Sequence, residues 1–414
     1  MWGGPRGRLE FCGGLAEDRI VNIRRIDPAE RPTASMPLQE YGFLASPLSE
    51  DALERLRSSQ RYYEGNLSLV AEEGGVPVAD ASGIPMQQNI RGTVYPMAGV
   101  AGVAAHPLAR RRGYARALVV ELLGRMRDEG HVVSALYPFR PSFYEKFGYV
   151  GVPKTRTVSF SPADLSGLLR AELPGEVSCE RLPSGYDGYR DFTCRLLAER
   201  HGFTLLPAYQ AAQVRDSEQW LATARVDGEI VGAVTYHITG HGGELLADDL
   251  LTTSPLGRAL LLRFLAHHVD QVSRVQLDID PAETPELWHT DLATTTEARV
   301  SFPAASAPMA RVLSLDALTG MPAGPGRAVV EIVDDTFIGG RYELDGTSGA
   351  LHVVNAPHRS AAATLTVAGL SGLVYGVLSP GDTVVRGFGA IPSDAVGELS
   401  VLFPRLNPYF CTHF

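Results

Sequence analysis

Residues 103–118 read VAAHPLARRRGYARAL, and the interpretation of the whole chain starts from this stretch. Three consecutive arginines, Arg110, Arg111 and Arg112, lead through Gly113 into a segment with helical spacing. The first turn of a helix presents up to four unpaired N–H groups and about half a positive charge. Glycine lets a ligand approach the backbone, and arginines add charge-assisted bonds to phosphate oxygens. The stretch therefore predicts an anion-binding loop at the start of a helix.

The elements on either side of this loop fit a strand, a helix and a second strand. PMAGVAGVAA (96–105) indicates a strand of small residues, in which Gly99 and Gly102 suggest a bulge or the close approach of a ligand. A helix is expected from about residue 113 to 128, because apolar residues recur every four positions at Tyr114, Leu118, Leu122 and Met126. HVVSALYP (131–138) predicts a buried strand. Strand, helix and strand together predict a right-handed crossover that covers a sheet.

Composition places the chain among soluble globular proteins of two to four domains. It has 414 residues, 45% hydrophobic and 20% charged, with a formal net charge of −10. This acidity disfavours nucleic-acid partners and mildly favours a cationic substrate. No apolar run is long enough to span a membrane, and the four cysteines show neither metal spacing nor a disulfide framework. This cysteine pattern favours a cytoplasmic protein with reduced thiols. No metal site is expected at the histidines.

The organisation of the chain suggests a flexible extension followed by three units. Residues 1–18 are Gly-rich, lack the apolar core of a signal peptide, and are interpreted as the extension. Residues 19–152 form the first predicted unit, with a strand at 20–26, a helix at 49–64 capped by Ser49, and two strands around a Gly-Gly turn at 66–85.

Residues 153–300 repeat the same order of elements. A strand (177–182), a helix (189–202), a hairpin turning at Asp227-Gly228, and a strand, helix and strand over 244–279 are expected. The loop equivalent to RRRGYA reads TTSPLGRALL (252–261), with one glycine and one arginine. A duplicated domain that kept its scaffold and lost its site fits this difference.

From residue 301 to 414 the pattern changes to an α+β unit. MARVLSLDAL (309–318) has a helix-like spacing. Short strands are expected over 328–335, 342–346, 350–354, 363–376 and 383–389, in a sheet that is predicted to be antiparallel. The fold class is therefore α/β with a final α+β unit.

Several motifs together resemble the GNAT acetyltransferases and, among them, the Eis (enhanced intracellular survival) family of bacterial N-acetyltransferases. They are VAAHP followed by RRRGYA, SFYEKFGYVG (142–151), MARVL (309–313) and the terminal phenylalanine. The resemblance extends over nearly the whole chain after residue 18. It implies two tandem GNAT-like domains, each a mixed twisted sheet flanked by helices, and a third domain similar to a sterol carrier protein.

The resemblance also implies a role for each matching residue toward acetyl-CoA. The backbone of Val103, Ala104 and Ala105 would pair with the pantetheine arm, which explains the small residues of this strand. The phosphates would be bound by the loop and helix start, which comprise Arg110, Arg111, Arg112, Gly113, Tyr114, Ala115 and Arg116. Phe139 and Arg140 stand where the family makes a further cofactor contact, although their side chains depart from the small and acidic pair expected there.

Acetyl transfer to an amine needs a base for the ammonium and an acid for the departing thiolate. In the resembled family the acid is a tyrosine, here Tyr144, whose phenol has an ordinary pKa of about 10. The base is the α-carboxylate of the last residue, here Phe414. The sequence adds that PYFCTHF (408–414) is apolar, which suggests a docked terminus. His413 is the alternative base, because its ordinary pKa is near 6.5.

The expected function is that of an acetyl-CoA-dependent N-acetyltransferase that acts on the primary amines of small molecules. The resemblance implies aminoglycosides, polyamines or protein lysines as acceptors, broad acidic pockets, and homohexamers. The other interpretation is a non-catalytic sensor that binds acyl-CoA or a lipid, although Tyr144 and the apolar terminus argue against it.

Overall fold

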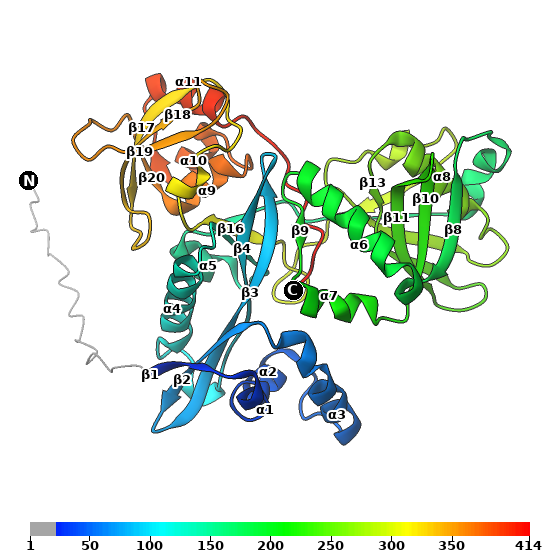
Figure 1. The fold of residues 1–414 in the computed structure, drawn as a ribbon, viewed down its shortest axis with the longest axis horizontal. Coiled ribbons are helices and arrows are strands. Elements are labelled where there is room, and N and C mark those ends of the chain that lie inside the picture. The colour runs from blue at the N-terminus through cyan, green and yellow to red at the C-terminus, as the bar shows by residue number, and fades with distance from the viewer. Residues whose placement is uncertain (1–21) are drawn as a thin grey trace, which may run out of the picture.

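The computed structural model describes residues 22–414, which form three units around three β-sheets (Figure 1). The predicted extension at 1–18, Cys12 and the first two residues of the strand expected at 20–26 lie outside this range. Within it, no helix is both long enough and apolar enough to cross a membrane. The expected boundaries at 152 and 300 remain predictions. One strand from beyond residue 300 belongs to the first sheet, so the units are not strictly consecutive in the chain.

The first sheet is antiparallel except at its centre. In spatial order it contains β1 (Asn22–Ile26), β2 (Leu67–Glu73), β3 (Val76–Ile90), β4 (Thr93–Ala105), β5 (Val133–Leu136), β16 (Met309–Val312) and β6 (Val150–Gly151), and β9 (Thr204–Leu205) pairs with β3. β4 and β5 are parallel and are joined by α4 (Tyr114–Asp128), as the sequence predicted. The apolar face of α4 is fully buried against β3 and β4, at Leu118, Leu122 and Met126.

Short helices precede and follow this core. α1 (Arg31–Ala34) and α2 (Met36–Phe43) were not predicted, whereas α3 (Glu50–Ser58) was, with the Ser49 hydroxyl accepting a bond from the Ala52 N–H as its cap. The predicted helix over 49–64 ends as a 3₁₀ turn (Ser59–Tyr63). α5 (Pro141–Tyr144) follows β5.

The second sheet repeats the plan of the first. Its strands are β15 (Thr295–Glu297), β7 (Arg156–Phe160), β14 (Arg274–Ile279), β12 (Glu244–Asp249), β11 (Glu229–Ile238), β10 (Trp220–Val226) and β8 (Glu176–Arg181), with β13 (Leu251–Thr252) paired to β11. β12 and β14 are parallel and are joined by α8 (Pro255–Ala266), as β4 and β5 are joined by α4. The other helices are α6 (Leu182–Glu199) and α7 (Ala208–Arg215). Asp227 and Gly228 both have positive φ, which confirms the predicted hairpin turn.

The third sheet differs from the prediction because it is mixed. Its order is β19 (His352–Asn355), β18 (Gly340–Asp345), β17 (Arg327–Val333), β20 (Ala363–Thr366) and β21 (Gly389–Ala390), and β17 pairs with β20 in parallel. After β19 the chain crosses to the edge of β17 that is not paired with β18, and there it forms β20. β20 therefore runs in the same direction as β17. The strand expected over 363–376 stops where Thr366 caps α9 (Val367–Val374). The strand expected over 383–389 is instead the end of α10 (Pro380–Val385) and the turn that leads to β21. α11 (Ser393–Leu402) completes the unit.

The helix-like spacing of MARVLSLDAL was also misleading, because Met309–Val312 is the strand β16. β16 lies between β5 and β6 and hydrogen-bonds to both, so it satisfies backbone groups that would otherwise form an open sheet edge. Arg311 is almost fully buried there and pairs with Asp335 of the third unit at 3.0 Å.

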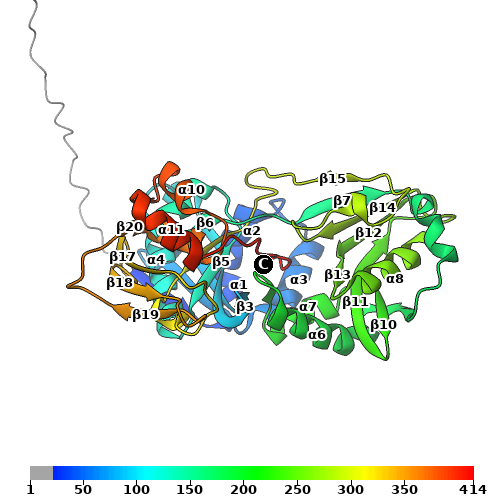
Figure 2. The ribbon, with the colours of Figure 1, turned by 90° about the horizontal axis from the view of Figure 1, so that it is seen from above.

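The tip of the β3–β4 hairpin is the point where the three units meet (Figures 1 and 2). The Asn89 side chain donates to the carbonyls of Leu197 and Ala198 in the second unit. The Arg91 guanidinium donates to three carbonyls farther along the chain: Leu373 at 3.0 Å, Val374 at 2.7 Å and Pro404 at 2.8 Å. Burial lowers the pKa of Arg91 to about 10, so this side chain remains charged at neutral pH.

Replacing Arg91 with alanine should destabilise the protein, because three buried carbonyls would lose their donor. Each loss costs about 1–3 kcal/mol, and we expect the Tm of R91A to fall by roughly 5 °C or more in differential scanning calorimetry. R57A is the control, because Arg57 is exposed and its one ion pair within residues 22–414 is with Glu54 on the same helix. Equal Tm values for R91A and R57A would contradict this role.

Candidate active site

The centre of the first sheet contains a strand edge without a partner. β4 pairs with β3 along its length, but its pairing with β5 covers only Met97–Val100. Among the described residues, no strand pairs with 101–105 on that side. On its other side, where β4 pairs with β3, the two residues Gly102 and Val103 of β4 face the single residue Ala81 of β3. This two-to-one pairing defines a β-bulge. Gly102 has a φ of 61°, and an added Cβ would lie 2.7 Å from the Gln39 side chain.

The arginine-rich loop leads from this edge to α4. Gly113 is the N-cap residue of α4 and has a left-handed backbone conformation (φ 90°). It has no side chain that could bond to the amides of the first turn. Arg110 donates to the Ala105 carbonyl at 3.3 Å, and Arg112 makes two bonds to Glu73. Arg111 and Arg116 are exposed and make no ion pair in the described part of the chain. The loop therefore offers helix-start amides and two uncommitted guanidinium groups to an anion.

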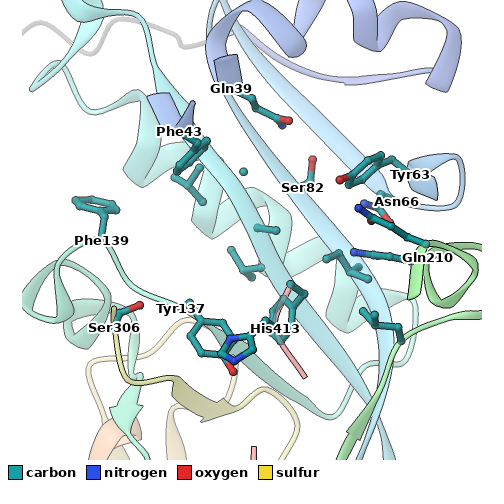
Figure 3. A pocket seen from close by; sticks show the side chains of 18 of the residues that line it. Gln39, Phe43, Tyr63, Asn66, Ser82, Tyr137, Phe139, Gln210, Ser306 and His413 are labelled. Carbon is teal, nitrogen blue, oxygen red and sulfur yellow. The ribbon is translucent and has the colours of Figure 1, made fainter. Parts of the chain in front are cut away.

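A cavity of about 990 Å³ opens beside the unpaired edge (Figure 3). Val103, Phe139 and Tyr144 are among the residues that line it. Its lining also includes many neutral polar side chains, among them Gln39, Tyr63, Asn66, Ser82, Gln210, Gln213 and Gln219. Its charged side chains are Arg31, Lys154 and Asp248, and the terminal residue Phe414 also lines it. The lining of the main cavity therefore combines positive and negative groups, whereas the resemblance implied an acidic pocket.

Tyr144 reaches this cavity from α5. Its side chain is 3% exposed and is held by aromatic contacts, with ring centroids 5.5 Å from Phe139, 5.0 Å from Phe143 and 6.1 Å from Tyr149. Its hydroxyl makes no hydrogen bond to another residue in 22–414. Burial raises the pKa of Tyr144, so the phenol is protonated at neutral pH. Tyr149 is fully buried instead, with its hydroxyl 2.6 Å from that of Ser134.

The last residues of the chain are docked against the same cavity. The Thr412 hydroxyl donates to the Thr204 carbonyl at 2.9 Å, and the Tyr137 hydroxyl donates to the Thr412 carbonyl at 3.1 Å. The His413 and Tyr137 rings lie 5.0 Å apart, and both line the cavity with Phe414. An added Cβ at Gly99 would lie 3.0 Å from the Phe414 ring, so Gly99 makes room for it. Burial lowers the pKa of His413, which favours its neutral form.

The remaining predicted site residues lie close by. Ala104 and Ala105 continue the unpaired edge, whereas Tyr114 is buried and Ala115 half-buried in the first turn of α4. Arg140 caps the start of α5, is exposed, and does not line the cavity. In the second unit the equivalent helix α8 is capped by its own Ser254 hydroxyl, which accepts from the Gly257 N–H at 3.1 Å.

A buried carboxyl network behind the main cavity was not found from the sequence. Asp80 is 1% exposed, and its Oδ2 accepts bonds from Ser35 at 2.7 Å and Gln39 at 2.6 Å. Its Oδ1 has no partner among the described residues. Burial raises the pKa of Asp80 to about 7, against the opposing effects of Ser35, Gln39 and Arg31. A signal that could have revealed it is an aspartate inside the small-residue stretch VADAS (78–82).

Known proteins similar to this chain in sequence are N-acetyltransferases. Residues 22–151 match the acetyltransferase (GNAT) domain family. N-acetyltransferase Eis of Mycobacterium tuberculosis is 36% identical over 87 residues, so the match covers 20% of this chain and 22% of that relative. An uncharacterized N-acetyltransferase of Streptomyces coelicolor is 27% identical over 278 residues, 60% of this chain and 64% of the relative.

Solved structures share the fold over nearly the full chain. A GCN5-related N-acetyltransferase from Kribbella flavida superposes with a TM-score of 0.78 at 22% identity, covering 95% of this chain and 99% of that one. Eis1 from Mycobacterium abscessus gives a TM-score of 0.75 at 18% identity, covering 95% and 100%. The chain is thus a tandem GNAT-fold protein whose first unit contains a GNAT acetyltransferase domain. Part of the chain is similar in sequence to N-acetyltransferase Eis, and nearly the whole chain shares the fold of Eis1.

Replacing Arg111 with alanine should weaken acetyl-CoA binding about tenfold, the equivalent of one lost charge-assisted contact to a phosphate. Isothermal titration would measure the Kd. R112A should have a smaller effect, because Glu73 already engages that guanidinium. S-acetylpantetheine, which lacks the nucleotide and its phosphates, should bind wild type and R111A alike, and a tenfold difference with this ligand would contradict the phosphate role.

Asp80 should make the protein less stable as the pH rises. Its pKa is raised to about 7 in the folded state, above an unfolded value of about 4, so the folded state binds more protons between these values. The stabilising contribution is complete below pH 4 and is lost as the pH approaches and passes 7. The Tm of D80N should therefore fall less than that of wild type between pH 5 and 8, and parallel Tm curves would contradict this assignment.

Proposed function

We propose that the chain is an acetyl-CoA-dependent N-acetyltransferase that acts on primary amines of small cationic acceptors, aminoglycoside-like compounds among them. The observation that carries this proposal is that Tyr144, Phe414 and the unpaired edge of β4 border one cavity. Orientation of an amine against a thioester lowers the barrier to direct transfer, so no covalent enzyme intermediate is required.

The residues of the first unit fit acetyl-CoA, which would supply the activated acetyl group when bound. The backbone at 103–105 would pair with the pantetheine amides as a neighbouring strand does. The amides at the start of α4, together with Arg111 and Arg116, would hold the diphosphate. The small side chains at 101–105 leave this edge accessible. These features support the proposal because acetyl-CoA bound in this way would bring its thioester toward the cavity that Tyr144 lines.

Tyr144 has the properties of the acid in this reaction. Its hydroxyl is free of bonds to other described residues, and burial keeps it protonated. The proton would pass to the sulfur of the departing thiolate. Because the ring is fixed by Phe139, Phe143 and Tyr149, the hydroxyl is oriented before the ligand binds.

The carboxylate of Phe414 would accept the proton of the attacking ammonium. The support for this assignment is the docking of residues 409–414, in which Tyr409 and Phe410 are each 1% exposed. His413 is the second candidate, because its lowered pKa leaves the imidazole neutral and able to accept a proton. Replacing His413 with glutamine separates the two, since it removes the imidazole and keeps the carboxylate.

Tyr144→Phe, and separately two residues appended after Phe414, should each lower kcat at least a hundredfold, the usual contribution of a general acid or base. Thiol release from acetyl-CoA, with tobramycin as acceptor, measures kcat, while the Kd for acetyl-CoA should change less than about twofold. Tyr149→Phe is the matched control and should keep kcat near the wild-type value. It removes a neighbouring phenol hydroxyl that bonds to Ser134, while its ring still packs against Tyr144.

Normal turnover by the tailed protein would exclude the Phe414 carboxylate as base, and loss of turnover in H413Q would assign the role to His413. Binding of acetyl-CoA without thiol release, for every amine tested, would overturn the proposed activity.

A further inference from the structure

One wall of the main cavity consists of buried polar side chains. Arg31, Asn66 and Gln210 line the cavity and are each at most 7% exposed, and Tyr63 lines it half-buried. Figure 3 shows Tyr63, Asn66 and Gln210 together on one side of the cavity, away from His413. We call Arg31, Tyr63, Asn66 and Gln210 the donor cluster.

The two amides of the donor cluster have unused N–H groups. The Tyr209 hydroxyl donates to Asn66 Oδ1 at 2.7 Å, so Nδ2 is the end left for the cavity. Gly65 makes room for the Tyr209 ring, because an added Cβ would collide with it. Neither Asn66 Nδ2 nor the Gln210 amide hydrogen-bonds to another residue in 22–414, and Gln210 Oε1 is buried. Both amides can therefore donate to a ligand.

The Arg31 guanidinium adds a positive charge to these donors. Three of its five N–H groups donate, to Gln60 at 3.1 Å, Ser68 at 3.1 Å and Gln39 at 3.5 Å, so two remain. The guanidinium carbon lies 4.9 Å from the centre of the Tyr63 ring. The Tyr63 hydroxyl makes no hydrogen bond within the described residues, and no described carboxylate forms an ion pair with Arg31.

The carboxyl that acts on Arg31 offsets its charge only in part. This carboxyl is Asp80, which hydrogen-bonds to Ser35 and Gln39 and makes no contact of ion-pair length with the guanidinium. Burial raises the pKa of Asp80 to about 7, so the group is only partly ionised at neutral pH. The donor cluster therefore keeps a positive potential toward the cavity.

The negative groups of the main cavity lie around the C-terminal residues instead. Burial lowers the pKa of His413, and Lys154 lowers it further, whereas Asp278 and Asp248 raise it. Asp248 and Lys154 both line the main cavity, and the α-carboxylate of Phe414 adds a second negative charge at this end. A molecule with an ammonium group at one end and an anionic group at the other fits this distribution of charge.

We propose that the donor cluster binds a carboxylate of the acceptor while the acceptor's amine lies beside Tyr144 and Phe414. The location of the reacting amine rests on the proposed function. The planar guanidinium of Arg31 and the planar amides suit the two oxygens of a carboxylate, which would accept charge-assisted bonds from them. The acceptor class is thereby narrowed to amines that also carry a carboxylate, with amino acids as the simplest members.

Matched acceptors test this directly. 6-Aminohexanoate and 6-aminohexanamide have the same length and one amine each, and differ by one negative charge. We expect kcat/KM for the acid to exceed that for the amide by about tenfold or more, the equivalent of one charge-assisted contact. The pair of 4-aminobutanoate and its amide covers a shorter spacing.

Variants of Gln210 assign the preference to the donor cluster. Q210E adds a negative charge there and should reduce the ratio of acid to amide at least about tenfold. Q210L removes the donors without adding charge and should reduce the ratio about threefold. Q271E, the same change as Q210E at an exposed position outside the cavity, is the control and should keep the wild-type ratio.

Binding provides a readout that does not depend on turnover. Hexanoate, which has the carboxylate and no amine, should raise the Tm of wild type and Q271E more than hexanamide does, and should raise that of Q210E and Q210L less. If no amine releases thiol but this pattern of Tm shifts appears, the proposed activity fails and the carboxylate site stands.

The carboxylate site is overturned if thiol is released but acid and amide react equally in both pairs, or if Q210E and Q210L leave the preference unchanged. Equal stabilisation by KCl at the same concentration as hexanoate would also overturn it, because the shift would then reflect ionic strength.

Discussion

The site depends on a strand that extends beyond its neighbour. β4 has 13 residues and β5 has 4, so the two can pair only before the bulge at Gly102. Unpaired backbone groups are costly when they are buried without a partner, and a ligand with amide groups can provide one. The same strand then leads into the arginine loop, which places helix-start amides in line with the open edge. One backbone feature thus joins an open strand edge to the start of a helix, and the proposed binding of acetyl-CoA rests on it.

The opposite end of the same hairpin holds the three units together. Asn89 and Arg91 bind carbonyls from the second unit, the third unit and the segment that leads to the C-terminus. His201 joins this junction by accepting the Arg91 N–H, and its pKa is lowered to about 4 by burial, which keeps it neutral beside the guanidinium. The last ten residues pass from this junction to the cavity, between the first and second units (Figure 2). The position of Phe414 is therefore coupled to the packing of all three units.

The sequence was sufficient for elements whose interactions are local. Helix spacing, the Asp227-Gly228 turn and the Ser49 cap predicted α4, the β10–β11 hairpin and α3. The roles of Tyr144 and the arginine loop remain predictions. It failed where distant partners decide the conformation. Met309–Val312 is a strand because β5 and β6 flank it, and β20 is parallel because β17 had a free edge. The environment of Asp80 was missed because its neighbours Ser35 and Gln39 come from a segment far away in the chain. The sterol-carrier likeness of the third unit remains a prediction.

The two copies of the GNAT fold differ in what their equivalent strand ends contain. In the first copy, β4 ends in small residues and leads to a loop whose helix has no side-chain cap, so the strand end and the helix start stay open to an anion. In the second, Ser254 caps α8, and β12, which is parallel to β14 and shifts register after Leu246, ends in Asp248 and Asp249. The equivalent strand end of the second copy thus has carboxylates where the first copy has small residues, and its helix start is closed by a side-chain cap. β9 pairs with β3 of the first sheet, and Asp248 lines the main cavity, so this end of the second copy forms part of the cavity wall.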